Sequence, residues 1–300
     1  MGVEDIGNID KPIVWSLCDM WPFTGINHYD VYDKQAPWRK ENFNSNAKFS
    51  LDKWLMNRKI KSWTKPINVV VPNRWMYDCV KDSKIMSNFN CHLIKWPIDD
   101  QIFFKKNKAE CKKKFKFDIN RKLLIFGSSN GLQDKRKGWQ YLEKALEQTE
   151  TDFDLLIFGI KEPSNFNFKF KGSIFFKDRI NDDFELCELY NSGDCLVIPS
   201  LNDNTPLISQ EAQMCGLPIV SFNHNGLSEI IEHKINGYKA KSFDIISLKD
   251  GIDWIFRNLD DDKLVKKTLQ MSQKVKLKFI GNEYKKLYKS ILDDVDKVIY

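Results

Sequence analysis

The sequence lacks the patterns that identify membrane-spanning, disulfide-stabilised and zinc-binding proteins. No stretch of its 300 residues approaches the roughly 18 consecutive apolar residues of a transmembrane helix. The seven cysteines are odd in number and never spaced as CxxC, and the four histidines show no ligand spacing. Neither a disulfide framework nor a zinc site is therefore predicted. The N-terminus also lacks the basic and then apolar order of a secretory signal, so we expect a reduced, cytoplasmic protein.

The sequence has little net charge. Its 47 Lys and Arg against 41 Asp and Glu give +6, and no nucleic-acid-binding motif accompanies them, so nucleic acid is not a predicted partner. The segment 126–131, FGSSNG, contains glycine but not the GxGxxG order, which gives little support to dinucleotide binding. Apolar residues are plentiful: 42% of positions are hydrophobic, with 21 Phe and nine Trp, so a sizeable core is expected.

From residue 121 onward, apolar runs of strand length alternate with helical patterns. The strand-like runs are 121–126, 153–158, 173–176, 195–198 and 218–222, and the helical patterns are 138–148, 183–190 and 206–215. Strands of about five residues that alternate with helices of about ten are typical of βαβ units with a parallel sheet. Such sheets bind ligands at the carboxyl ends of their strands, so the loops after these strands form the candidate site.

The first third of the chain predicts another α/β region. Strand-like runs occur at 13–17, 67–71 and 92–94, with a helical pattern at 51–61. These are few strands for a complete sheet. Seven of the nine Trp residues also lie before residue 97, and this uneven distribution indicates two regions of different design.

A lysine-rich segment lies between the two regions, with seven lysines in residues 105–116. Charge runs are most often solvated, so we interpret this one as an exposed helix face or a linker. The alternative is peripheral contact with an anionic membrane surface, since each basic residue near such a surface contributes about 1 kcal/mol of attraction.

The most informative segment is 199–218, PSLNDNTPLISQEAQMCGLP. Residues 203–205 are of types that cap helices, Pro206 suits the first helical position, and Gly216 suits a helix exit. A helix of about ten residues is thus predicted to begin directly after a strand. Its N-terminal amides then face the ligand crevice, which favours a phosphate there.

One carboxylate of this predicted helix, Glu211, lies in the middle of its apolar side when residues are placed at about 100° intervals. That side consists of Leu207, Ile208, Met214 and Cys215, and the opposite, solvent-facing side of Ser209, Gln210 and Gln213. Because burial of an ionised carboxylate is costly, Glu211 must meet hydrogen-bond donors. The donors are either core groups, such as backbone amides or a neighbouring cation, or a ligand. The pattern alone leaves both open.

The spacing of Asp203 and Glu211, acidic-x7-acidic before a Cys-Gly-Leu-Pro turn, resembles the signature of family-4 retaining glycosyltransferases of exopolysaccharide or colanic-acid type. Further segments are similar to motifs of that family: 15–29 (WSLCDMWPFTGINHY), 71–83, 96–99, 136–139 (RKGW) and 225–229 (NGLSE). The resemblance covers most of the chain. It implies a GT-B-like α/β fold, in which two Rossmann-like domains contain parallel sheets.

The resemblance also implies a domain organisation. Residues 1–117 would form an acceptor-side N-terminal domain, residues 118–278 a nucleotide-sugar-binding domain, and residues 279–300 a helix that crosses back to the first domain. Family members have several strands and a Gly-rich loop before the motif at 15–29. The N-terminal domain is therefore expected to be incomplete, and a partner chain would supply the missing segment.

In such enzymes the second domain binds most of a nucleotide-sugar donor. By resemblance, Glu211 accepts hydrogen bonds from the ribose, and Asp203 meets hydroxyls of the transferred sugar. Lys137, with Arg136, neutralises the leaving diphosphate, so no metal or other cofactor is expected. The remaining donor-binding positions are the amides of Asn204, Thr205 and Leu207, together with Ser128 and with Ile180 near the base.

The first-domain motif contributes Cys18 and Asp19 beside the reacting sugar. Cys18 replaces a family histidine, and a thiol cannot reproduce imidazole hydrogen bonding. An arginine that usually precedes Lys137 by five or six residues is also absent.

The predicted function is metal-independent transfer of a sugar, with retention, from a nucleotide sugar to a saccharide or lipid-linked acceptor. Because of Cys18 and the missing start of the N-terminal domain, a catalytically impaired, nucleotide-sugar-binding or accessory subunit stays an alternative. A sugar-nucleotide epimerase on the same architecture is a weaker alternative.

Overall fold

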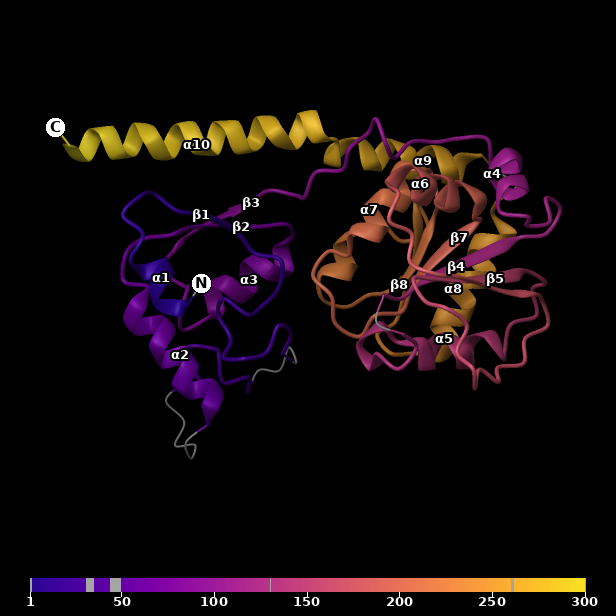
Figure 1. The fold of residues 1–300 in the computed structure, drawn as a ribbon, viewed down its shortest axis with the longest axis horizontal. Helices are drawn as coiled ribbons and strands as arrows, with labels where there is room; N and C mark the ends of the chain where they lie inside the picture. The colour runs from indigo at the N-terminus through magenta and orange to yellow at the C-terminus, as the bar shows by residue number, and fades with distance from the viewer. Residues whose placement is uncertain (1, 31–34, 44–49, 130, 260–261, 300) are drawn as a thin grey trace. The chain divides into compact units, whose positions relative to one another are not determined.

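The computed structural model describes residues 2–299 except 31–34, 44–49, 130 and 260–261, with side chains up to residue 293. Contacts divide the chain into two units, Met1–Trp96 with Ile280–Tyr300, and Pro97–Phe279 (Figure 1). The boundary at 96–97 replaces the expected one at 117–118. Segment 97–117 joins the second unit because the apolar side chains of Ile98, Phe103 and Phe117 are buried in that unit's core.

The second unit is a six-stranded parallel sheet with the order β6-β5-β4-β7-β8-β9. Its strands are β4 (Leu123–Gly127), β5 (Asp154–Phe158), β6 (Ile174–Lys177), β7 (Cys195–Ile198), β8 (Ile219–Phe222) and β9 (Gly237–Ala240). Its helices are α4 (Lys108–Lys114), α5 (Trp139–Leu146), α6 (Asp183–Ser192), α7 (Leu207–Met214), α8 (Ile245–Arg257) and α9 (Lys263–Ser272). Short 3-10 turns are η1 (Lys135–Lys137), η2 (Asn225–Glu229) and η3 (Gln273–Val275).

Both faces of this sheet are covered, which explains why its strands read as continuous apolar runs. Alternate residues of β4 point to opposite faces: Leu123 and Ile125 join one buried cluster, and Leu124 and Phe126 join the other. Figure 1 shows α6 and α7 over one face and α5 and α8 over the other. The parallel α/β architecture is thus the predicted one.

The first unit contains a three-stranded parallel sheet in the order β1-β2-β3. Its strands are β1 (Val14–Ser16), β2 (Asn68–Val71) and β3 (Asn90–Leu93), and its helices are α1 (Val3–Gly7), α2 (Leu51–Ser62) and α3 (Arg74–Asp82). Helix α10 (Leu277–Ile299) packs Ile280 and Leu287 against Val70 and Ile94. The Ser16 Oγ and Tyr284 Oη atoms, 2.8 Å apart, form a hydrogen bond between sheet and helix.

The lysine-rich segment forms helix α4 and is not a simple solvated face. Lys112 is 3% exposed, and its Nζ atom lies 3.1 Å from Asp194 Oδ2. Lys108 also pairs with Asp194, and Lys106 and Lys114 both pair with Glu188. These lysines are therefore engaged by carboxylates of their own unit, which weakens the membrane-contact alternative.

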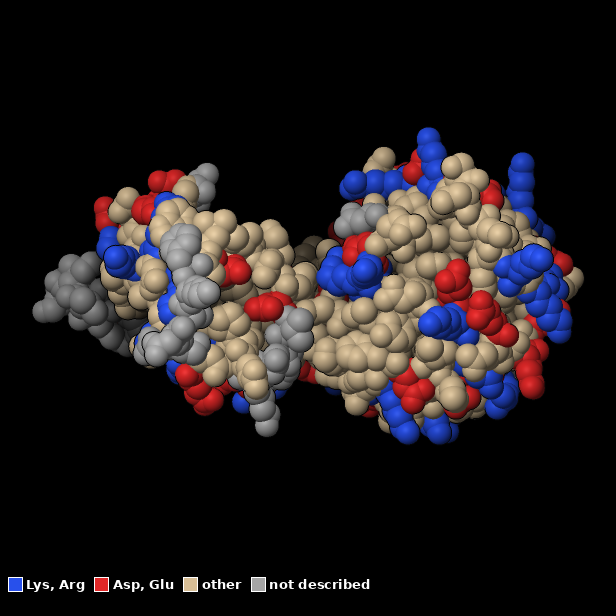
Figure 2. All heavy atoms as spheres, turned by 90° about the horizontal axis from the view of Figure 1, so that it is seen from below, with Lys and Arg blue, Asp and Glu red and all other residues tan. Residues whose placement is uncertain are grey.

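The described residues include no helix with the length and apolar character needed to cross a membrane. On the face drawn in Figure 2, basic and acidic side chains of the second unit are interspersed and form no single basic patch.

Candidate functional site

Helix α7 begins at the carboxyl edge of the sheet, shortly after β7. It starts at Leu207, with Pro206 as its N-cap residue, so the prediction that Pro206 takes the first helical position is wrong by one residue. The side chain of Pro206 makes no capping hydrogen bond, and the first amides of any helix lack partners within it. The helix ends as predicted at Gly216, which adopts a left-handed conformation with φ 75°.

A carboxylate and two cations meet beside this helix N-terminus. Asp203 Oδ2 lies 3.0 Å from Lys137 Nζ and 3.3 Å from Arg136 Nη1. Asp203 Oδ1 accepts a hydrogen bond of 3.1 Å from the N–H of Asn204. The Asp203 side chain is only 8% exposed, so these charges interact in a largely desolvated place. The structure thus brings Asp203, Lys137 and Arg136 together, as the sequence motifs suggested.

Glycine at position 138 allows the loop after β4 to lie directly against Pro199, which follows β7. Gly138 has a positive φ of 73°, and a Cβ atom there would lie 1.9 Å from the carbonyl oxygen of Pro199. The Leu201 N–H also donates to the Arg136 carbonyl at 2.8 Å. Because β4 and β7 are neighbouring strands, the loops that follow them meet, and the cations reach Asp203 from the first of these loops.

The cluster, which also includes Asp134, suits an anionic ligand. Asp134 Oδ2 lies 3.7 Å from Arg136 Nη2, so two carboxylates balance the two cations in this structure. The N-terminus of α7 adds a partial positive charge and amide donors. A phosphate at that N-terminus would therefore compete with Asp203 for Lys137 and Arg136.

Glu211 lies one turn further along α7. Its Oε2 atom accepts a hydrogen bond of 2.8 Å from the hydroxyl of Tyr190, a residue of α6. Burial raises the pKa of Glu211 above its usual value, and the Tyr190 hydrogen bond offsets part of that rise. The expectation that a donor meets this carboxylate is confirmed, although the donor is a tyrosine and not one of the groups named from sequence.

The predicted solvent face of α7 is wrong. Ser209, Gln210 and Gln213 are buried, whereas Leu207 is 47% exposed. Helix α9 contacts α7, and the Gln213 Nε2 atom donates to the Ile230 carbonyl at 2.9 Å. Segments that follow β8 therefore cover the polar side of α7, and a wheel drawn for one helix cannot anticipate them.

Two further predicted positions lie at the same edge of the sheet. Ser128 follows β4 and is buried; its hydroxyl donates to the Gly131 carbonyl at 2.8 Å, which stabilises the turn. Ile180, in the loop between β6 and α6, packs partly buried against the core cluster under α6 and α7. Asn204 and Thr205 are also buried at this edge.

Residues 110–278 match the family model described as Glycosyl transferases group 1. The chain belongs to this family. The matched range contains Asp203, Glu211, Arg136 and Lys137, so the cluster and the partly buried glutamate both lie within the part that matches the group 1 family.

Curated relatives support the same family. An uncharacterized glycosyltransferase of Haemophilus influenzae is 32% identical over 152 residues, which are 47% of this chain and 40% of that protein. The N-acetyl-alpha-D-glucosaminyl L-malate synthase of Bacillus anthracis is 25% identical over 57% of this chain and 43% of that protein. The matches thus span less than half the length of these relatives.

Solved structures show the likeness in fold. Sucrose-phosphate synthase from Thermosynechococcus elongatus has a TM-score of 0.68 at 18% identity, over 81% of this chain and 63% of that chain. Anabaena Alr3699/HepE, in complex with UDP-glucose, has a TM-score of 0.66 at 14% identity, over 93% of this chain and 72% of that chain. The predicted GT-B-like α/β fold with parallel sheets is confirmed.

Cys18 and Asp19 lie in the first unit of this group 1 glycosyltransferase. The thiol of Cys18 belongs to an exposed residue. Asp19 Oδ2 lies 2.7 Å from His28 Nδ1, and Asp19 Oδ1 accepts a hydrogen bond of 2.9 Å from the Trp21 N–H. An imidazole therefore does lie beside Asp19, although it comes from position 28 and not from position 18.

The loop that carries Cys18 and Asp19 is stabilised by a buried lysine that the sequence did not indicate. Lys59 of α2 donates to the carbonyls of Trp21, Thr24 and Gly25, and its Nζ atom lies 3.9 Å from the Trp21 ring centroid. Burial lowers the pKa of Lys59 to about 7.

Sequence reasoning also missed Tyr190 and Asp134. The available signal for Asp134 is its type and position, because aspartate directly before a short helix is a common N-cap, and its carboxylate accepts the Arg136 N–H at 3.0 Å. Tyr190 had no such signal, because its hydroxyl reaches Glu211 only through the packing of α6 on α7.

Proposed function

We propose that the chain is a retaining, metal-independent glycosyltransferase that moves a sugar from a nucleotide-sugar donor to a saccharide or lipid-linked acceptor. The observation that carries the proposal is the cluster of Asp203, Lys137 and Arg136 at the N-terminus of α7, one turn before the partly buried Glu211. At one edge of the sheet, the cations and helix amides suit a diphosphate, and the partly buried carboxylate of Glu211 suits a ribose of the same ligand.

In this proposal Glu211 accepts hydrogen bonds from the ribose hydroxyls, which requires its ionised form. The backbone around Asn204, Thr205 and Leu207 lies against the diphosphate. Ser128 shapes the turn beneath the donor, and Ile180 lies near the base.

Charge stabilisation of the leaving diphosphate is the main catalytic contribution in this scheme. As the bond to the anomeric carbon breaks, negative charge develops on the diphosphate, and Lys137 and Arg136 move from Asp203 toward it. Asp203 then accepts hydrogen bonds from hydroxyls of the transferred sugar. In the same proposal Asp19, with His28 beside it, and Cys18 act on the acceptor.

The relatives support the choice of donor class. Alr3699/HepE was solved with UDP-glucose, and the pneumococcal O-GlcNAc transferase GtfA with UDP and GlcNAc. Both are similar to this chain in fold, at 14% and 17% identity. The cytoplasmic placement inferred from the cysteines stays a prediction, as does a partner chain for the first unit.

The experiment that tests this function is the release of free nucleoside diphosphate from a panel of nucleotide sugars. We expect the purified chain to release it from at least one donor, and a saccharide acceptor to accelerate the release. Activity in the parent would exclude the accessory subunit. Activity only in Cys18→His would indicate an impaired enzyme, and product formed from the donor alone, without released diphosphate, would indicate an epimerase.

A further inference from the structure

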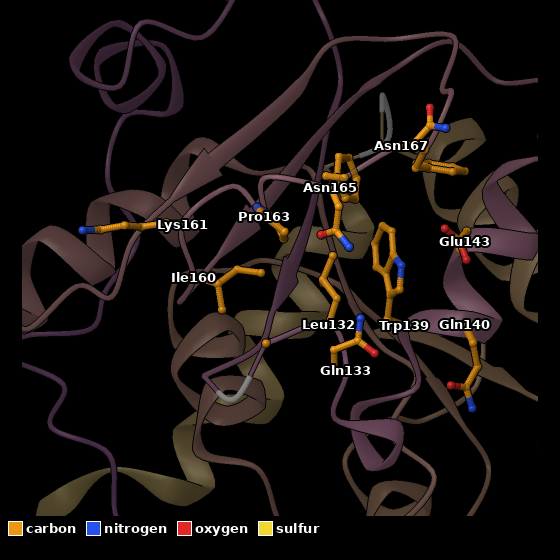
Figure 3. A pocket seen from close by; sticks show the side chains of 13 residues that line it. Leu132, Gln133, Trp139, Gln140, Glu143, Ile160, Lys161, Pro163, Asn165 and Asn167 are labelled. Carbon is orange, nitrogen blue, oxygen red and sulfur yellow. The ribbon is translucent and has the colours of Figure 1, made fainter.

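A cavity of the second unit lies apart from the cluster at α7. It is framed by residues 131–133 after β4, by the start of α5, and by residues 160–168 after β5 (Figure 3). Its volume of about 690 Å³ is typical of small-molecule sites, which occupy roughly 300 to 1,000 Å³. Neither Asp203 nor Glu211 lines it, so it is not the proposed donor site.

Packed aromatic rings form the inner wall of this cavity. The Trp139 ring centroid lies 6.1 Å from that of Phe166 and 5.8 Å from that of Phe168. Trp139 also packs on Phe126 of the core, at 5.6 Å. The wall is therefore formed before any ligand arrives, which lowers the entropic cost of binding.

The rim of the cavity is polar and unusually rich in amides. The polar residues of the rim are Gln133, Gln140, Glu143, Asn165 and Asn167. Within the part of the chain that the structure describes, none of these five side chains has a hydrogen bond or an ion pair. An amide offers donors and acceptors together, and this is the combination that the adjacent hydroxyls of a sugar require.

The charge of the lining indicates which class of ligand it suits. Among the lining residues that the structure describes, Glu143 and Lys161 are the ionisable ones, and none is an arginine. Figure 3 shows the Lys161 side chain directed away from the other labelled lining residues. A diphosphate is held best by several converging cations, and the described lining residues offer a single lysine and no arginine. Aromatic rings beside uncharged amides suit the apolar faces and the hydroxyls of a neutral sugar.

We propose that this cavity is a second saccharide site, which binds a short uncharged oligosaccharide apart from the donor. The inference rests on the lining of the cavity and does not require the transfer reaction. It also has a consequence for that reaction. One loop carries Leu132 and Gln133 at the cavity and, a few residues later, Arg136 and Lys137 at the cluster, so a saccharide bound here would contact the loop that also carries the two cations.

The test uses the purified full chain and a panel of uncharged trisaccharides of glucose, galactose, mannose and N-acetylglucosamine, followed by saturation-transfer NMR and titration. We expect at least one to bind. Asn165→Ala and Gln140→Ala should each weaken that binding about fivefold, because each removes roughly one hydrogen bond. Both residues are exposed, so the variants should fold and melt like the parent. Gln101→Ala, at an exposed glutamine outside the cavity, is the matched control and should leave binding unchanged.

Three results would overturn the proposal: no binding by any trisaccharide, equal binding by the parent and both cavity variants, or displacement of the trisaccharide by a nucleoside diphosphate. Glu211→Gln separates this site from the donor site. That variant should keep its trisaccharide affinity while losing donor affinity, so failure of one proposal is distinguishable from failure of the other.

Discussion

Asp203 makes three interactions through its two carboxylate oxygens, with Lys137, Arg136 and the Asn204 N–H. An ionised carboxylate offers about four acceptor positions, so one stays available to a sugar hydroxyl even before the cations move. The motif spacing named Asp203, Lys137 and Arg136 as candidate residues. It did not predict that they pair with one another, because that pairing depends on β4 and β7 being neighbours in the sheet.

The raised pKa of Glu211 predicts a pH dependence of donor binding. Burial raises this pKa, so the carboxyl group protonates at a higher pH than an exposed glutamate does. Donor affinity should therefore fall as the pH falls through that raised pKa, since the protonated acid accepts fewer ribose hydrogen bonds. Titration calorimetry between pH 5 and pH 8 measures this. Glu211→Gln should flatten the profile on its acid side, and an equally steep fall in that variant would contradict the assignment.

Lys137 and Lys135 both lie on η1, so a Lys135 variant is a matched control for a Lys137 variant. Lys137→Ala should lower kcat by about a hundredfold to a thousandfold, because it removes a cation from the developing charge of the diphosphate. Lys135 is exposed, so Lys135→Ala should leave kcat near that of the parent. Steady-state kinetics with the donor identified in the release assay makes the comparison, and similar rates in the two variants would count against the cluster.

For helix α7, the position in the chain and the C-terminal end could be predicted from the sequence, but the buried side could not. Its place after a strand and its exit at Gly216 follow from local residue types, and both occur as expected. Which of its sides is buried depends on α9 and on the segment around Ile230, which come later in the chain. Helix α4 is similar, because its lysines look solvated until Asp194 and Glu188 are placed beside them.

Two neighbouring lysines of α4 give a stability prediction. Lys112 is 3% exposed and pairs with Asp194, whereas Lys113 is exposed. Lys112→Ala should lower the free energy of unfolding by about 3 kcal/mol, the lower end for breaking a buried pair, since Lys108 still pairs with Asp194. Lys113→Ala should change it little. Urea denaturation measures the free energy of unfolding of both variants, and equal values would contradict a stabilising Lys112–Asp194 pair.

The same pair predicts how stability responds to acid. Burial acts to raise the pKa of Asp194, but Lys108 and Lys112 outweigh it and hold that pKa below its usual value. For a carboxyl group with a lowered pKa, the stabilisation is complete above its unfolded value, about 3.9, and is lost as the pH falls through the folded value. The difference between the parent and Lys112→Ala should therefore shrink below about pH 4, and a difference that stays constant in acid would contradict this.

For the molecule as a whole, the alternation of apolar runs predicted a parallel sheet after residue 121 and another α/β region before it, and the resemblance implied parallel sheets in both; both sheets are present. The expected boundary follows the lysine-rich segment 105–116, whereas contacts place it at 96–97, because Ile98, Phe103 and Phe117 lie in the core of the second unit. Strand β9 and helices α8 and α9 were not predicted. The edge strand β9, GYKA, has too few apolar residues to form a recognisable run.

At this scale the proposal also predicts the stereochemistry of the product and its dependence on metal. NMR of freshly formed product should show the anomeric configuration of the donor. Because Lys137 and Arg136 supply the positive charge, the rate should be unchanged by a chelator. An inverted product, or a rate abolished by chelation and restored by a divalent cation, would contradict the proposed reaction.

The proposed function depends most directly on Glu211 and the α7 N-terminus forming the donor site. The measurement that tests it is calorimetric titration of the parent, Glu211→Gln and Glu147→Gln with the common nucleoside diphosphates at neutral pH. At least one should bind the parent, and its affinity should fall about tenfold or more in Glu211→Gln, since a hydrogen bond to a charged group contributes roughly 1.5 to 3 kcal/mol. Glu147→Gln, at an exposed glutamate that follows α5, should bind like the parent. Binding that is equally strong in all three proteins, or absent from the parent, would contradict the account.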